Sequence, residues 1–127
     1  YLDDTSIDLF YTHYWYEPYD DYALKFVRIN LDSVSYVQDV SVDQYGVIVD
    51  VKLYNDRYYV LMESFRGAFL LYELDTADLS VADTHSCPIE GSVARIEITD
   101  DVLNIVSIDY DDDRKLHYQP ILNLKSE

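Results

Sequence analysis

The sequence predicts an all-β fold built from antiparallel meanders. Three observations predict it. The apolar residues are mainly Val, Ile, Leu and fourteen Tyr, a mixture that favours strands. Short polar turn signals interrupt the apolar runs, and one segment repeats without a gap 45 positions later, from Gly46 to Gly91. We expect one domain, because 127 residues give room for a single core.

The first third of the chain is predicted to hold an incomplete copy of the repeat. Residues 6–12 (SIDLFYT) are expected to form a middle strand, and residues 22–31 (YALKFVRINL) the strand that follows across a turn. Residues 34–42 are a candidate outer strand. Because alternate residues of a strand face opposite sides, Leu9 is expected on one face and Phe10 on the other.

The two copies of the repeat are residues 46–63 and residues 91–108. In each copy a β-rich run leads into two polar residues, Asn55-Asp56 or Asp100-Asp101, and then into a second β-rich run. Polar pairs in this position predict hairpin turns. Further strands are predicted at residues 68–74, 79–84 and 116–122.

Three meanders at this period are typical of the blades of a WD40-like β-propeller, whose repeats run about 40 to 50 residues. The prediction is a partial propeller, with a partial blade at 1–45, a blade at 46–90 and a partial blade at 91–127. A single β-sandwich is the alternative, because 127 residues also suit that fold.

Two blades and a part of a third cannot close a ring, which needs about four to eight blades. An open blade face of roughly 400 Å² corresponds to about 10 kcal/mol of burial, comparable to the stability of a whole domain. We therefore expect the missing blades to come from another segment of the same polypeptide or from a partner, and the isolated segment to fold poorly. A first residue that is Tyr1 and not Met agrees with a segment of a longer polypeptide.

The charge of the chain excludes some classes of partner. There are 25 acidic and nine basic residues, for a formal net charge of −16, which disfavours binding to nucleic acid and to anionic membranes. An acidic decoy that imitates nucleic acid and binds a basic protein is an alternative function. The single cysteine, Cys87, allows no intrachain disulfide and indicates an intracellular compartment, nuclear or cytoplasmic.

No catalytic or metal-binding motif is visible. His13, His85 and His117 lie far apart, without the spacing of a metal site. Cys87 has no neighbouring base except His85, and the acidic run Asp109–Asp113 lacks the glycine that an EF-hand loop needs at its sixth position. The chain is therefore expected to be no enzyme and to carry no metal and no cofactor.

Residues 8–22 (DLFYTHYWYEPYDDY) hold seven aromatic side chains in fifteen positions. Packing within the predicted strands accounts for Phe10, Tyr11 and Tyr22, at the two ends of this segment. The predicted tip of the hairpin, residues 12–21, keeps four more, which exceeds what a solvated turn requires. Aromatic side chains beside carboxylates are common anchors of protein interfaces. The predicted partner-binding residues are Tyr14, Trp15, Tyr16 and Tyr19; the alternative is a loop that folds back on its own blade.

A double change of Trp15→Ala and Tyr16→Ala tests this hypothesis. We expect it to weaken assembly with a partner protein more than it lowers the stability of the chain, because interface anchors contribute mainly to binding. Co-purification and thermal unfolding of the same variant measure the two effects. An equal loss of both contradicts the hypothesis.

The strand pattern also resembles a known family. IVDVKLYNDRYYVLMESFRGAFLLYEL (48–74), the segments DDTSIDLF (3–10) and YALKFVRINLDSV (22–34), and PIEGSVARIEITDDVLNIVSIDYDDDRKLHY (88–118) are similar to the C-terminal β-strand region of the anaphase-promoting complex subunit 4 family. In that family, C-terminal strands complete a WD40-like propeller. The resemblance implies a non-catalytic scaffold in a multi-subunit ubiquitin ligase, with other protein subunits as its partners. A carbohydrate-binding β-sandwich stays open as another alternative.

Overall fold

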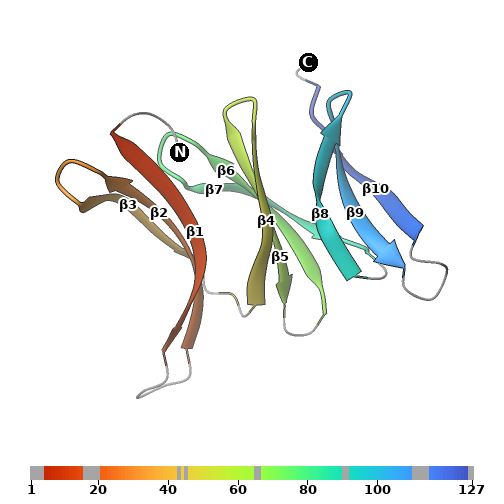
Figure 1. Ribbon diagram of the computed structural model, residues 1–127, viewed down its shortest axis with the longest axis horizontal. Helices are drawn as coiled ribbons and strands as arrows, with labels where there is room; N and C mark the ends of the chain where they lie inside the picture. The colour runs from red at the N-terminus through yellow and green to blue at the C-terminus, as the bar shows by residue number, and fades with distance from the viewer. Residues whose placement is uncertain are drawn as a thin grey trace.

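The computed structural model describes residues 5–15, 21–42, 44, 46–64, 67–89, 92–109 and 115–125. These residues form ten β-strands in three antiparallel sheets and contain no helix (Figure 1). The all-β prediction is confirmed. Within these ranges there is accordingly no helix that could cross a membrane.

The first sheet has the order β1-β2-β3, with β1 at Ser6–Trp15, β2 at Asp21–Asn30 and β3 at Ser35–Val42. The prediction of a middle strand at residues 6–12 is wrong for the described residues, because β1 is an edge strand that pairs with β2 alone. The middle position belongs to β2. The alternation along β1 is confirmed, since Phe10 packs against the core and Leu9 is exposed.

The middle sheet has the order β4-β5-β6-β7. Its strands are β4 (Gly46–Tyr54), β5 (Arg57–Ser64), β6 (Phe69–Asp75) and β7 (Val81–Cys87). The third sheet, ordered β10-β9-β8, has β8 (Ser92–Thr99), β9 (Val102–Asp109) and β10 (Lys115–Asn123).

Both hairpin turns of the repeat are where the sequence predicts them. Asn55 and Asp56 have φ angles of 49° and 60°, and Asp100 and Asp101 have 51° and 61°. Two successive residues with positive φ form the type I′ turn that matches the twist of a β-hairpin, and Asn and Asp tolerate this conformation best among residues with a side chain.

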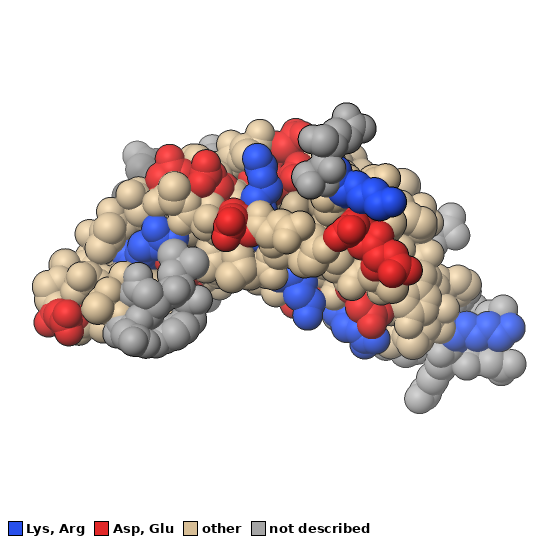
Figure 2. Space-filling model, turned by 90° about the horizontal axis from the view of Figure 1, so that it is seen from above, with Lys and Arg blue, Asp and Glu red and all other residues tan. Residues whose placement is uncertain are grey.

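The three sheets stand side by side along an arc, and the arc is hollowed on one side (Figures 1 and 2). The first strand of each sheet lies on that side, with β4 beside both β1 and β8. The sheets do not close into a barrel or a ring, and three separate sheets differ from the two layers of a β-sandwich.

Two apolar cores hold the sheets together, one on each face of the middle sheet. Leu24 and Phe26 of the first sheet pack with Val60 and Met62 on one side, and Ile96, Leu103 and Ile105 of the third sheet pack with Leu61 and Leu71 on the other. All five residues from Tyr58 to Met62 are therefore buried, as expected for a strand covered on both faces.

A polar network ties the first sheet to the middle sheet. Asp8 on β1 is buried and accepts hydrogen bonds from Arg28 Nε at 2.8 Å and from the Tyr58 hydroxyl at 2.5 Å. Arg28 also donates to the carbonyl oxygens of Thr76 and Ala77, at 2.5 and 3.0 Å, in the turn between β6 and β7. Burial and the Asp8 carboxylate raise the pKa of Tyr58 above its usual value, so this hydroxyl stays a donor at neutral pH.

Asp50 ties the middle sheet to the third. It lies where the register of β4 shifts against β5, and its Oδ2 accepts a hydrogen bond of 2.8 Å from the backbone N–H of Ile96 in β8. Its Oδ1 accepts the N–H of Val51 at 2.8 Å. A second bond between the sheets runs from the Tyr54 hydroxyl to Asp101.

Candidate functional site

Only two of the four predicted partner-binding residues, Tyr14 and Trp15, lie within the described residues. Tyr14 and Trp15 belong to β1, where their backbones pair with Tyr22 and Asp21, so the prediction that the hairpin tip begins at residue 12 is wrong. Aromatic residues favour strands, which lets the ladder continue to this point. Tyr16 and Tyr19 lie outside the described residues.

The face of the first sheet that is turned away from the middle sheet is partly apolar. Phe26 packs toward the middle sheet, so its neighbour Val27 and the cross-strand partner Leu9 face the other way. Tyr36, opposite Ile29, lies on the same outer face. Leu9 is 39% exposed and Tyr36 is 62% exposed.

The third sheet has a corresponding outer face. Ile105 packs toward the middle sheet, so Val106 and its partner Tyr118 face away from it, together with Ile108 and its partner Leu116. Leu116 is 47% exposed and Tyr118 is 55% exposed. We call these two surfaces the end faces of the row of sheets.

Each end face combines apolar and charged groups. On the first, Lys25 Nζ lies 2.5 Å from Asp39 Oδ1, and on the third, Arg95 Nη2 lies 3.6 Å from Glu97 Oε2. Protein–protein interfaces likewise combine an apolar centre with a polar rim.

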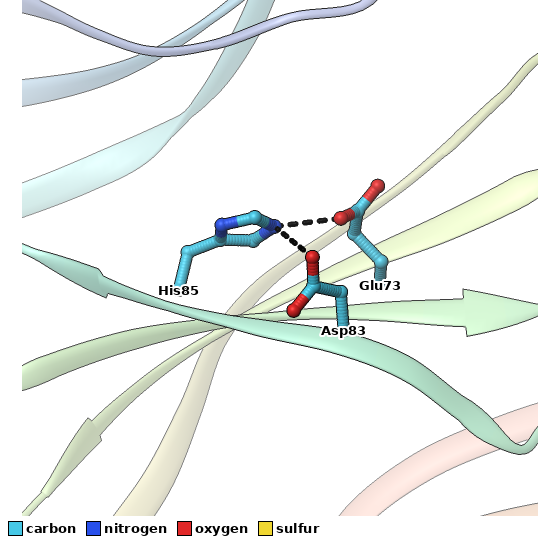
Figure 3. A group of neighbouring side chains, drawn as sticks. All are labelled: Glu73, Asp83 and His85. Carbon is cyan, nitrogen blue, oxygen red and sulfur yellow. Dashed lines mark hydrogen bonds and ion pairs between the residues drawn. The ribbon is translucent and has the colours of Figure 1, made fainter.

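A compact group of possible metal ligands lies on the middle sheet. Glu73 of β6 and Asp83 of β7 are cross-strand partners, and His85 follows two residues later on the same face of β7. Figure 3 shows the three side chains pointing toward one another. His85 Nε2 lies 2.6 Å from Glu73 Oε2 and 3.6 Å from Asp83 Oδ2.

The neighbours of this group help to orient it. Asp83 Oδ1 accepts a hydrogen bond of 2.8 Å from the backbone N–H of Thr84, which leaves Oδ2 directed at His85. Tyr59 is the partner of Glu73 on β5, and burial and the nearby Glu73 charge raise the pKa of its hydroxyl. The side chain of Glu73 itself is half-buried.

Sequence reasoning missed this group. His85 is far in sequence from the other two histidines. The signal that points to the group is the local spacing of Asp83 and His85, which puts both side chains on one face of a strand. The partner Glu73 emerges only from the pairing of β6 with β7.

Cys87 is the last residue of β7. Its side chain is buried, and burial raises the pKa of the thiol to about 11. A thiol with such a pKa is protonated at neutral pH and is a poor nucleophile.

Comparisons with known proteins leave the family open. No protein-family model matches the chain, and the search of curated proteins finds no match.

Proposed function

We propose that this chain is part of a WD40-like β-propeller and acts as a non-catalytic scaffold in a larger protein assembly. The arrangement of the sheets supports the proposal. Each sheet is a meander, the first strand of each lies on the hollow side of the arc, and neighbouring sheets pack face to face. Radial repetition of such sheets is the construction of a propeller.

The observation that carries the proposal is the pair of end faces. Both end faces expose large hydrophobic side chains to solvent. They are Leu9 and Tyr36 at one end, and Leu116 and Tyr118 at the other. Inside the row, the equivalent surfaces of neighbouring sheets cover each other. The end faces therefore offer the same kind of contact to a further sheet, from the same polypeptide or from a partner protein.

The class of partner follows from the resemblance to the anaphase-promoting complex subunit 4 family. We take the partners to be protein subunits of a multi-subunit ubiquitin ligase. The strongly acidic composition supports a protein partner over nucleic acid or an anionic membrane, because phosphates repel carboxylates.

Sedimentation of the 127-residue chain over a concentration series tests whether the end faces need a cover. We expect association that grows with concentration and is lost in a variant with Leu9→Asp and Tyr118→Asp, because each change puts a charge on one end face. The control is Leu53→Asp, which puts the same charge on an exposed leucine of β4.

A wild-type chain that stays monomeric at every concentration and melts in one sharp transition contradicts the open-ended scaffold. The partner class has its own test, which is affinity capture from cells followed by mass spectrometry. Recovery of ubiquitin-ligase subunits is expected with the wild-type chain and not with the double variant, and recovery of none contradicts that partner class.

A further inference from the structure

Glu73, Asp83 and His85 bring three possible metal-ligand atoms close together on the middle sheet. All three side chains stand on the paired strands β6 and β7, and no loop is involved. Within the described part of the chain, every ion pair that Glu73 or Asp83 makes is to His85. Two carboxylates thus converge on one imidazole (Figure 3).

The distances suit a small divalent cation. One ligand atom from each residue lies within 4.8 Å of the other two. Bonds of about 2.0–2.2 Å in a tetrahedral zinc site place the ligand atoms about 3.3–3.6 Å from one another. The Asp83–His85 pair, at 3.6 Å, already has this spacing, and the Glu73–His85 pair, at 2.6 Å, reaches it when the two side chains move apart by about 1 Å.

A hydrogen bond between His85 and Glu73 accounts for only two of the three groups. In the tautomer that carries its hydrogen on Nε2, the imidazole has one hydrogen to donate there, and the 2.6 Å contact with Glu73 takes it. Asp83 nevertheless directs Oδ2 at the same nitrogen, while Thr84 holds its other oxygen. A cation bound by Nε2 and both carboxylates satisfies all three groups at once.

We propose that Glu73 Oε2, Asp83 Oδ2 and His85 Nε2 bind one Zn²⁺ ion. Imidazole and carboxylate together suit first-row transition metals, whereas Mg²⁺ and Ca²⁺ take oxygen ligands. The side chain of Asp83 is 62% exposed, so water completes the tetrahedron and the ion enters from solvent. The bound ion joins β6 to β7 at the edge of the middle sheet, and the proposal does not depend on the scaffold function.

Calorimetric titration of the 127-residue chain with Zn²⁺ tests the site. Excess Mg²⁺ is included to occupy weak carboxylate sites, because the chain has 25 acidic residues. We expect one Zn²⁺ per chain, and at least tenfold weaker binding for Asp83→Asn and for His85→Gln, since even the loss of a residue that only supports a ligand costs 10- to 100-fold. The matched control is His117→Gln, which removes an imidazole from β10 and is expected to leave binding unchanged.

Asp83 is exposed, so Asp83→Asn retains the fold, as far-ultraviolet circular dichroism checks. The NMR signals of the His85 ring nitrogens give a second measurement, in which Zn²⁺ shifts Nε2 in the wild-type chain. Absence of saturable binding in Mg²⁺, or binding that Asp83→Asn and His85→Gln leave as tight as in the wild-type chain, overturns the proposal.

Discussion

Replacing Asp8 by Ala is expected to destabilise the chain by about 3–5 kcal/mol, the cost of removing one partner from a buried ion pair. Asp8 is 7% exposed and accepts hydrogen bonds from both Arg28 and Tyr58. Without the Asp8 carboxylate, the guanidinium still donates to the carbonyl oxygens of the β6–β7 turn, but its charge stays half-buried between two sheets without this ion-pair partner. Urea unfolding at a fixed protein concentration measures the change.

The matched control is Asp39→Ala. Asp39 also forms an ion pair, with Lys25 at 2.5 Å, but it lies on an exposed edge strand, where ion pairs contribute little. Tyr58→Phe separates the parts of the network, because it removes one hydroxyl and keeps the ion pair, and we expect a cost of about 1 kcal/mol. A midpoint for Asp8→Ala no lower than that of Asp39→Ala contradicts the assignment of Asp8 as the tie between the sheets.

Asp50→Ala is the second change with a large expected effect. It leaves the N–H groups of Val51 and Ile96 without their acceptor, and an unpaired buried donor costs about 1–3 kcal/mol. A loss of about 2 kcal/mol or more is therefore expected in urea unfolding. Because the Ile96 bond joins β4 to β8, amide exchange in β8 is expected to accelerate more than exchange in β2.

Asp78→Ala serves as the control for Asp50→Ala. Asp78 likewise accepts two hydrogen bonds, from the N–H and the hydroxyl of Ser80, but both lie within one exposed turn. We expect a smaller shift of the urea midpoint and no change of exchange in β8. Equal shifts for the two variants, or unchanged exchange in β8 with Asp50→Ala, contradict the role of Asp50 between the sheets.

These two carboxylates explain how the sheets keep their places in the arc. Apolar contacts between sheets have little directional preference, whereas Asp8 and Asp50 bond to particular groups of the neighbouring sheet. In the proposed scaffold, the angle between sheets determines where the end faces meet the next part of the assembly. The polar ties therefore contribute to function through geometry as well as through stability.

The local elements could be predicted because their causes are local. Asn55-Asp56 and Asp100-Asp101 adopt positive φ angles as the hairpin signal predicts. Gly46 opens β4 so close to β5 that a Cβ would collide with the carbonyl oxygen of Glu63. This close approach gives a physical reason for a glycine at the start of the repeat.

Two predictions for the first sheet, the middle position of residues 6–12 and the start of the hairpin tip at residue 12, are wrong for the same reason. The ladder of β1 and β2 extends to Trp15 and Asp21, and β1 is an edge strand of its sheet. The strand character of residues 6–15 is visible in their composition. Which strand lies beside another, and how far the pairing continues, depends on contacts between segments that are distant in sequence.

The all-β class, the two hairpin turns and the alternation of faces could be predicted from the residues alone, because backbone conformation and side-chain polarity act between near neighbours. The contacts of Asp8 with Tyr58, of Asp50 with Ile96 and of Glu73 with His85 are seen only in the folded chain. Those contacts join residues that are 50, 46 and 12 positions apart. Their physical origin is the pairing of strands and the stacking of sheets, which no local pattern encodes.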